Sequence, residues 1–458
     1  MSTTCSPDNL NAVFKAYDVR GTVPDQLDEE LARAVGTAYV QVLGVQAVVV
    51  GYDMRPSSPG LAGAFADGAT AAGADVTMIG LASTDQLYFA SGHLELPGAM
   101  FTASHNPAQY NGIKLCRAFA QPVGAESGLL EIRDRVAEGV GTSGSGSGSI
   151  SETDVLQAYA AHLLTLAPVR GRRLKVVVDA GNGMAGHTAP AVFERLADQV
   201  DLVPMYFELD GTFPHHEANP IEAANLVDLQ ERVLAEKADV GLAFDGDADR
   251  CFLVDERGRA VSPSTLTALI ASRELAKEPG ATIIHNLITS RAVPEIVEEL
   301  GGKPVRTRVG HSYIKGTMAE TGAIFGGEHS GHFYFRDFWR ADSGMLAALH
   351  ALAALAETDQ SLSEVLASYE RYPLSGEINS TVADQQAVLT ALEEKYGDQD
   401  GVTIDHLDGL SVQHADWAFN VRASNTEPLL RLNVEGEDIA TMEKIRDEAL
   451  AVIRGGAA

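Results

Sequence analysis

The chain has 458 residues, of which 45% are hydrophobic and 21% are charged, values typical of a packed globular protein. Its 34 basic and 63 acidic side chains give a net charge of −29, which argues against a general binder of nucleic acids or anionic membranes, because both need basic surface. The three cysteines are too few for a disulfide framework, and the sequence contains neither a signal pattern nor an apolar run of about 20 residues. We therefore expect a cytoplasmic protein, in which any anionic substrate is held by a local group of basic side chains.

Three short β-branched runs indicate the fold class. They lie at residues 47–53, 175–183 and 281–287, and each leads through Gly or Asp into a helix-like segment. This alternation predicts mixed α/β units with buried, partly parallel strands, and three of them suggest three related domains. The end of the chain contains two helical patterns and short strands, so we predict an additional small α+β domain there.

Breaks in composition divide the chain into four domains. A Gly/Ser-rich stretch covers residues 141–149. At residues 255–263, a turn precedes a helix-start signal. The segment 370–380, which contains Pro and Gly, follows an Ala/Leu-rich helical pattern. The predicted domains are residues 1–150, 151–258, 259–372 and 373–458.

The strongest chemical signal is the segment GLAFDGDADR at residues 241–250. An apolar strand ends at Phe244, and alternate side chains of an extended or tightly looped backbone after it point the same way, so three carboxylates can converge. These are Asp245, Asp247 and Asp249. Carboxylates this close repel one another unless a cation lies among them, and oxygen ligands suit Mg²⁺ or Ca²⁺. Because Mg²⁺ prefers few protein ligands together with a phosphate oxygen, the neighbouring Arg250 suggests that the missing ligand is a phosphate.

Two other interpretations of this segment exist. It can be a solvated acidic turn, or an EF-hand loop with Glu256 at the twelfth position. The EF-hand fails because its sixth position, where the turn needs glycine, is Arg250, and because strands flank the segment.

The segment FTASHNP places Ser104 where an apolar strand runs out into a turn. The turn is predicted at Asn106 and Pro107, because proline fixes φ and disfavours helix in the residue before it. Serines in such places usually satisfy local backbone groups, so the segment alone leaves open whether Ser104 is a nucleophile. Lys114 follows shortly after it in the sequence.

Two segments suit a phosphorylated sugar. In RASNTEP, the planar guanidinium of Arg422 matches phosphate oxygens, and a tight loop adds further donors, although a helix N-cap is the alternative. The loop donors are Ser424, Asn425 and Thr426. In GGEHSGH, Glu328 and Ser330 are two positions apart and suit neighbouring sugar hydroxyls, or they belong to a plain Gly-rich turn.

Two more segments contribute basic and aromatic side chains. In VGHSYIKG, His311 precedes Lys315 at helical spacing, and His311 is either an acid/base group or a structural histidine. In FKAYDVRG, Tyr17 and Arg20 are expected in a turn before a helix. Neither segment predicts a function by itself.

Taken together, the segments TASHNP, DGDADR, GEHSGH and RASNTEP, in this order, resemble the α-D-phosphohexomutase superfamily, and its phosphomannomutase/phosphoglucomutase branch fits best. The resemblance covers essentially the whole chain. It implies an α/β fold with three similar mixed α/β domains plus a smaller C-terminal α+β domain around a central cleft.

The resemblance also implies a role for each site residue. Among these residues, Ser104 carries a phosphoryl group, and His311 and Lys114 handle protons. The implied catalytic residues are Ser104, Lys114, His311 and Arg20; the implied Mg²⁺ ligands are Ser104, Asp245, Asp247 and Asp249; the implied substrate-binding residues are Tyr17, Arg250, Glu328, Ser330, Arg422, Ser424, Asn425 and Thr426.

The reaction implied by the resemblance moves a phosphoryl group between the 6- and 1-positions of a hexose, through phosphoserine and a hexose 1,6-bisphosphate that is also the activator. Mannose 6-phosphate is the expected substrate, and glucose phosphates are second substrates. The resemblance favours this branch over the phosphoglucosamine mutases, because those generally have glycine at the position of Asn425. The alternatives are a phosphoglucosamine mutase, a phosphoglucomutase, a phosphosugar phosphatase and a phosphosugar-binding protein. We expect a monomer or weak dimer that binds a hexose phosphate and neither nucleic acid nor membrane.

Two positions depart from the pattern of the family. Asp85 replaces the usual proline after Thr84, and Ser343 replaces a usual aspartate. Neither position is among the implied site residues.

Overall fold

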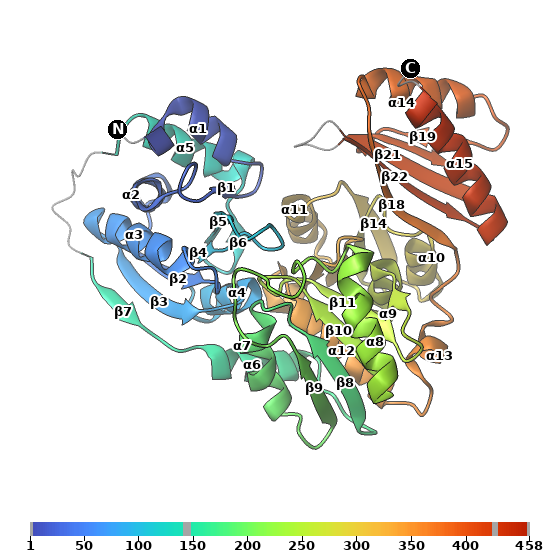
Figure 1. Cartoon of the computed structure of the whole chain (residues 1–458), viewed down its shortest axis with the longest axis horizontal. Helices are drawn as coiled ribbons and strands as arrows, with labels where there is room; N and C mark the ends of the chain where they lie inside the picture. The colour runs from blue at the N-terminus through green and yellow to red at the C-terminus, as the bar shows by residue number, and fades with distance from the viewer. Residues whose placement is uncertain (1–2, 141–147, 424–428, 456–458) are drawn as a thin grey trace. The chain divides into compact units, whose positions relative to one another are not determined.

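The computed structural model describes residues 3–140, 148–423 and 429–455 (Figure 1). The chain divides into two compact units. The first comprises Met1–Ser262 with Ser330–Val365, and the second comprises Pro263–His329 with Leu366–Ala458. Within the described ranges, no helix is both long and apolar enough to cross a membrane.

The first sheet of the first unit has the strand order β1-β5-β4-β2-β3-β7, and β6 pairs with β5. Its strands are β1 Val19–Thr22, β2 Ala47–Tyr52, β3 Asp75–Leu81, β4 Gly98–Phe101, β5 Tyr110–Arg117, β6 Gln121–Pro122 and β7 Ile150–Glu152. Strand β2 runs parallel to β3 and β4, whereas β5 is antiparallel to β4 and β1. The apolar run of β2 is buried in the sheet, as a parallel strand covered by helices requires.

Five α-helices accompany this sheet. They are α1 Pro7–Val13, α2 Glu29–Leu43, α3 Ser58–Ala71, α4 Thr84–His93 and α5 Leu129–Ala137. Helices α2 and α3 cross closely, since a Cβ atom at Gly36 would lie 2.2 Å from the carbonyl oxygen of Phe65, and one at Gly68 would lie 2.0 Å from that of Arg33. Glycine at these two positions therefore permits the crossing.

The second sheet of this unit has the order β12-β11-β10-β8-β9. Its strands are β8 Leu174–Asp179, β9 Val200–Met205, β10 Val240–Phe244, β11 Cys251–Asp255 and β12 Ala260–Val261. Strand β8 is parallel to β9 and β10, and β11 returns antiparallel to β10. The acidic segment therefore forms the tight connection between β10 and β11, directly after the predicted strand end at Phe244.

The helices α6 Leu156–Leu166, α7 Ala185–Glu194 and α8 Val227–Glu236 belong to the same part of the chain. The unit also contains the hairpin of β16 Phe333–Phe335 and β17 Ala341–Asp342, and helix α12 Gly344–Ala356. Almost every residue of α12 is buried, because it is apolar on all sides and packs against β11 and α6.

The second unit begins with a parallel sheet in which β13 lies between β14 and β15. The elements of this part are α9 Pro263–Lys277, β13 Thr282–Asn286, α10 Ala292–Glu299, β14 Lys303–Thr307, α11 His311–Thr321 and β15 Phe325–Gly327. The short helix α13 Leu362–Leu366 precedes the C-terminal part.

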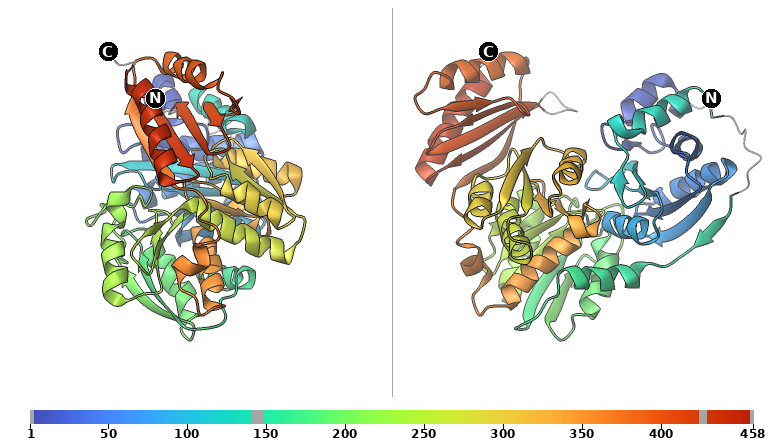
Figure 2. Two further views of the ribbon diagram at one scale, coloured as in Figure 1. Left: turned by 90° about the vertical axis from the view of Figure 1, so that its right-hand side faces the viewer. Right: turned by 180° about the vertical axis from the view of Figure 1, so that it is seen from behind.

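The C-terminal sheet is antiparallel throughout, with the order β18-β22-β21-β20-β19. Its elements are β18 Leu374–Thr381, α14 Gln385–Tyr396, β19 Thr403–Asp405, β20 Leu410–Gln413, β21 Trp417–Ala423, β22 Leu429–Gly436 and α15 Ile439–Gly455. Helices α14 and α15 contact each other and pack on the sheet (Figure 2). The four sheets confirm the predicted fold class of three mixed α/β parts and a smaller C-terminal α+β part.

One local expectation is wrong. Arg20 does not lie in a turn before a helix but on strand β1, opposite Gly112 of β5. Residues of β1 alternate between buried and half-buried positions, which is the pattern of a strand, and the next helix begins only at Glu29.

Candidate active site

Ser104 lies in the loop that follows β4, with 2% of its surface exposed. Its φ of 49° is in the left-handed region, which L-residues rarely adopt. The backbone N–H of Ser104 donates to Oγ1 of Thr102 at 2.9 Å, and its own Oγ donates to Oδ2 of Asp245 at 2.8 Å. The serine of one loop and the acidic segment of another therefore meet directly.

Arg55, which was not predicted from the sequence as a site residue, binds the backbone of the Ser104 loop. Its buried guanidinium donates to the carbonyl oxygens of four residues of the loop, over distances of 2.6 to 2.9 Å. The acceptors are Ser104, Asn106, Pro107 and Tyr110. Its Nε lies 3.2 Å from Oδ2 of Asp53, and both side chains of this ion pair are completely buried. Because the guanidinium presents its donors in a rigid fork, it fixes the course of this loop.

The three aspartates of the acidic segment converge as predicted. Asp245, Asp247 and Asp249 are fully buried, and one carboxylate oxygen of each lies within 4.8 Å of the others. Burial, together with the charges of Asp249 and Asp247, raises the pKa of Asp245 well above its usual value. Burial acts in the same direction on Asp247, but the Lys114 ammonium and the Thr84 hydroxyl overcome it and lower the pKa of that carboxyl.

The donor set of this acidic triad fits a divalent cation. Oδ1 of Asp247 and Oδ1 of Asp249 are buried, and neither has a hydrogen-bond donor among the described residues. Buried acceptors without donors are costly unless a cation is present, and three carboxylates match the oxygen ligands that Mg²⁺ prefers. The triad could therefore hold the metal ion, with Ser104 beside it.

Lys114 of β5 lies between two of these carboxylates. Its Nζ is 2.7 Å from Oδ2 of Asp247 and 2.6 Å from Oδ2 of Asp249. Burial alone would lower the pKa of Lys114, but the two aspartates raise it well above its usual value. The ammonium is therefore held in its charged form.

Arg250 links the acidic triad to two histidines that the sequence analysis did not single out. Its Nε is 3.3 Å from Oδ2 of Asp245 and donates to Nε2 of His332 at 3.3 Å, while Nη2 contacts Nδ1 of His105 at 2.8 Å. Burial and the neighbouring Arg250 lower the pKa of His105 well below its usual value, so this imidazole is neutral. His332 is the last residue of the segment GGEHSGH, so the sequence motif could have identified it as a candidate site residue.

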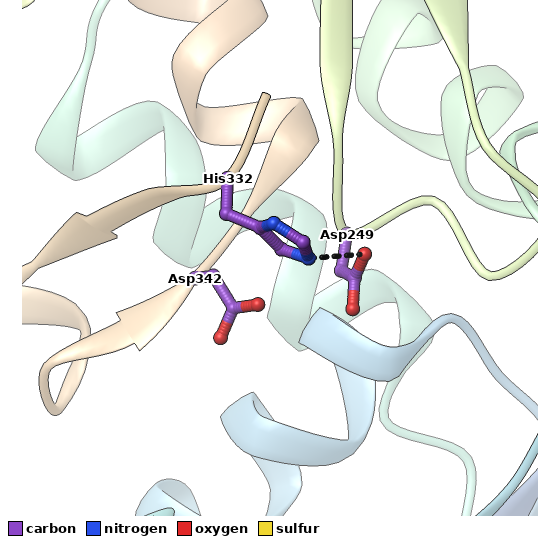
Figure 3. A group of neighbouring side chains, drawn as sticks. All are labelled: Asp249, His332 and Asp342. Carbon is purple, nitrogen blue, oxygen red and sulfur yellow. Dashed lines mark ion pairs between the residues drawn. The ribbon is translucent and has the colours of Figure 1, made fainter. Parts of the chain in front are cut away.

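His332 also connects the triad to Ser330. Its Nε2 lies 3.5 Å from Oδ1 of Asp249, and its Nδ1 lies 2.9 Å from Oγ of Ser330. Figure 3 shows the imidazole directed at Asp249, with the carboxylate of Asp342 on β17 beside them. One ligand atom of each of these three residues lies within 4.8 Å of the others, so the acidic cluster extends to the β16–β17 hairpin.

Arg20 lies on β1, and Tyr17 lies just before it in the sequence. Arg20 donates from Nη1 to Oδ1 of Asn106 at 2.5 Å and to the carbonyl oxygen of Ala103 at 3.2 Å, and Nη2 forms an ion pair with Asp18. The guanidinium of Arg20 is thus fastened to the Ser104 loop. Tyr17 precedes the strand and is half-buried.

The remaining predicted residues belong to the second unit. Glu328, at the end of β15, is buried, and its Oε1 accepts from the N–H of Gly310 at 3.1 Å and from Nδ2 of Asn286 at 3.3 Å. His311 is the first residue of α11. Arg422 on β21 forms an ion pair of 3.4 Å with Glu377, and its buried Nε has no hydrogen-bond partner among the described residues. The predicted loop donors Ser424, Asn425 and Thr426 lie outside the described residues.

The second unit also contains a cavity of about 450 Å³ whose lining includes His285, Arg291, Arg306 and Asn433. Neither Glu328 nor Arg422 lines it, and we do not assign it to the substrate.

The structure thus joins eight of the predicted residues in the first unit. Ser104, Lys114, Arg20 and Arg250 connect to Asp245, Asp247 and Asp249 through the contacts above, and Ser330 joins them through His332. Tyr17 belongs to the same unit, whereas Glu328, His311 and Arg422 belong to the second. A buried serine beside an acidic triad that could hold a metal ion, with several cations around it, is an arrangement suited to phosphoryl transfer.

Comparison with known proteins gives the same class. The phosphoglucomutase/phosphomannomutase models match domain I at residues 11–140, domain II at 157–258, domain III at 262–372 and the C-terminal domain at 377–452. The chain is 41% identical over 453 residues to a protein of Xanthomonas campestris pv. campestris described as "Phosphohexose mutases", covering 96% of this chain and 99% of that one. It is 40% identical over 450 residues to the phosphomannomutase of Salmonella montevideo, covering 96% and 98%.

A solved structure agrees. The phosphoglucomutase/phosphomannomutase family protein of Burkholderia thailandensis matches with a TM-score of 0.88 and 33% identity, over 100% of this chain and 99% of that one. Fold and relatives therefore define a phosphohexose mutase, an isomerase that moves a phosphoryl group on a sugar. The chain belongs to the phosphoglucomutase/phosphomannomutase family.

Proposed function

We propose that this mutase converts mannose 6-phosphate to mannose 1-phosphate, and glucose phosphates more slowly, by way of phosphorylated Ser104. The observation that carries the proposal is the contact of 2.8 Å between Oγ of Ser104 and the acidic triad. Support for mannose comes from the relatives named phosphomannomutase, of which the one from Escherichia coli K12 is 39% identical over 440 residues.

In the proposed mechanism, a hydroxyl of the bound hexose phosphate attacks the phosphorus of phosphoserine 104. A P–O bond to the sugar forms as the P–Oγ bond breaks, the sugar hydroxyl loses its proton, and Ser104 regains one when free. The bisphosphate then turns over and returns its other phosphoryl group to Ser104. Mg²⁺, when bound by Asp245, Asp247 and Asp249, neutralises the charge on the phosphoserine, which carries about −1.5 to −2.

The side chains around Ser104 have distinct parts in this proposal. Arg250 and Arg20 supply positive charge to the moving phosphoryl group. Lys114 and His311 are the proposed proton handlers, and the Lys114 ammonium also balances the charges of Asp247 and Asp249. Glu328 and Ser330, two positions apart in the sequence, are each proposed to hold a sugar hydroxyl.

The distal, non-reacting phosphate is assigned to the Arg422 loop, with Ser424, Asn425 and Thr426 as further donors. Within the described residues Nε of Arg422 has no hydrogen-bond acceptor, and this supports the assignment, because a guanidinium with an open donor can bind phosphate without breaking an existing bond. A hexose 1,6-bisphosphate would restore the phosphoserine whenever the intermediate escapes. Cytoplasmic location, the monomer or weak dimer, and the lack of nucleic-acid and membrane partners remain predictions.

The test is a coupled assay that compares mannose 1-phosphate, glucose 1-phosphate and glucosamine 1-phosphate, each with Mg²⁺ and an activating hexose 1,6-bisphosphate. We expect the highest kcat/KM with mannose 1-phosphate. A higher value with glucosamine 1-phosphate would reject mannose as the main substrate. Release of inorganic phosphate at the rate of turnover would instead identify a phosphatase.

A further inference from the structure

Asp85 is a completely buried carboxylate outside the acidic triad. It lies in the first turn of α4, next to the N-cap Ser83. Its carboxylate accepts from the hydroxyl of Ser83, from that of Tyr159 at 2.7 Å and from that of Ser343 at 2.6 Å. Burial raises the pKa of Asp85 to about 6. Within the described ranges, no Lys or Arg forms an ion pair with it, so hydroxyl groups alone stabilise this buried carboxylate.

The three hydroxyls belong to three different helices. Ser83 caps α4, Tyr159 lies on α6, and Ser343 caps α12 by accepting the N–H of Leu346 at 3.0 Å. One carboxylate therefore fastens the starts of α4 and α12 to each other and to α6.

The starts of α4 and α12 both contact the loop that carries the triad. Thr84, the first residue of α4, donates from Oγ1 to Oδ2 of Asp247 at 2.6 Å and from its N–H to the carbonyl oxygen of Asp247 at 3.0 Å. At the start of α12, a Cβ atom on Gly344 would lie 2.6 Å from the carbonyl oxygen of Arg250 and 2.9 Å from that of Ala248. The triad loop is thus in contact with both helix starts that Asp85 joins.

We infer that Asp85 is a positioning residue that sets the geometry of the triad loop, with Ser343 as its obligatory partner. It touches neither substrate nor metal, and it acts through Thr84 on one side and through the start of α12 on the other. The inference rests on the proposed function, because it takes the triad to be the metal site.

Asp85 and Ser343 are also the two positions at which the sequence departs from the family. In this chain the carboxylate on α4 accepts and the hydroxyl on α12 donates, and the same contact can form with the two groups exchanged. Exchanging the two side chains should therefore preserve the link, whereas changing either one alone should break it.

The test compares Asp85→Ser, Ser343→Asp and the exchanged double variant, with Mn²⁺ binding followed by the electron paramagnetic resonance signal of the free ion. Asp85→Ser leaves the hydroxyls of Tyr159 and Ser343 without their acceptor. Ser343→Asp places a second carboxylate beside Asp85 without a cation. We expect each single variant to bind Mn²⁺ about 10- to 100-fold more weakly, as changes behind metal ligands do. The double variant should bind within about threefold of the wild type.

The steady-state constants provide a readout that a general loss of structure would not reproduce. For folded variants we expect the activating Mg²⁺ concentration to rise in parallel with the Mn²⁺ dissociation constant, while KM for the hexose phosphate stays within about twofold. Asp384→Ser is the matched control, because Asp384 caps α14 in the second unit through the N–H of Ala387. It should leave Mn²⁺ binding unchanged.

The outcomes separate this inference from the proposed function. If the wild type binds no Mn²⁺, both the metal site and the inference are wrong. If the wild type binds Mn²⁺ and Asp85→Ser binds it equally well, only the inference is overturned. If Asp85→Ser does not fold, the comparison of Ser343→Asp with the double variant decides, and a double variant no better than the single one would overturn the inference.

Discussion

The surroundings of Ser104 in the first unit and those of Arg422 in the second are built differently. Around Ser104, the buried Asp247 is held at 2.7 Å by Lys114 and at 2.6 Å by Thr84. Among the described residues, Arg422 forms an ion pair of 3.4 Å with Glu377, which also pairs with Arg431 at 3.2 Å. At the proposed reacting end, the side chains are therefore held in place by other protein side chains. At the end that we assign to the distal phosphate, the described residues leave a donor of Arg422 open for a ligand.

This difference has a physical reason. Phosphoryl transfer depends on electrostatic groups that are already in place when charge develops, so their positions must be fixed by other side chains. A group that grips a substrate and then releases it benefits from open donors instead, because binding then breaks few existing contacts.

The largest expected effect is at the acidic triad. Asp247→Ala removes a proposed metal ligand and also the partner of Lys114 and Thr84, so kcat should fall by at least about 1,000-fold. The measurement is the coupled mutase assay at saturating Mg²⁺. Asp67→Ala serves as the control, because Asp67 forms only an exposed ion pair with Arg33, and it should keep full activity. A kcat within tenfold of the wild type would show that the triad is not the reacting end.

The next effect concerns stability. Arg55→Met should lower the free energy of unfolding by about 3–5 kcal/mol, because it leaves the buried Asp53 unpaired and removes the donors of the Ser104 loop. Urea titration followed by circular dichroism measures it. Arg422→Met is the matched substitution in the other region and should cost less than about 1 kcal/mol. Equal losses in the two variants would contradict the contrast between the regions.

A third prediction concerns the pH dependence of stability. Burial lowers the pKa of His285 in the second unit to about 4, below the unperturbed value of about 6.5. The unfolded chain therefore takes up this proton first, and the stability associated with neutral His285 is present above about pH 6.5 and lost as the pH falls towards about 4. The shift corresponds to about 3 kcal/mol at most.

His285→Gln should reduce the difference in unfolding free energy between neutral and mildly acidic solution, measured by urea titration at pH 7.5 and pH 4.5. His406→Gln is the matched control, because the side chain of His406 is 60% exposed rather than buried. If both variants show the wild-type dependence, His285 is not neutral in the folded protein.

The smallest effect is on substrate binding. Arg422→Ala should raise KM for mannose 1-phosphate by roughly 10- to 150-fold, the loss of about 1.5–3 kcal/mol expected for hydrogen bonds to a charged group. Because this contact is made away from the reacting phosphoryl group, labelling of Ser104 by a bisphosphate at saturating concentration should still occur. Arg431→Ala, which removes the other partner of Glu377, is the control. A KM unchanged by the loss of Arg422 would contradict its assignment to the phosphate.

The sequence predicted the parts of the site that are local. Asp245, Asp247 and Asp249 follow one another at alternate positions, so their convergence could be expected from backbone geometry alone. The role proposed for Ser104 could be predicted only from the family resemblance, because its own segment resembles an ordinary turn. The three mixed α/β parts likewise followed from three short β-branched runs between helical patterns, and the C-terminal α+β part followed from two helical patterns with short strands.

The supporting contacts could not be predicted, because they join residues far apart in sequence. Arg55 reaches the carbonyl oxygens of the Ser104 loop across about 50 positions, and Asp85 reaches Ser343 across 258. Nothing in either local segment shows which partner the fold will bring to it. The strand character of the residues around Arg20 was missed for a similar reason, since it depends on pairing with β5.

The most direct test of the central claim is phosphoryl transfer to Ser104 itself. The purified protein would be incubated with Mg²⁺ and glucose 1,6-bisphosphate and weighed by intact-mass spectrometry, in parallel with Ser104→Ala. We predict a gain of a single phosphoryl group in the wild type, located on Ser104 by peptide mapping, and no gain in the variant. A wild type that never gains this mass, or a variant that gains it equally, would contradict the account.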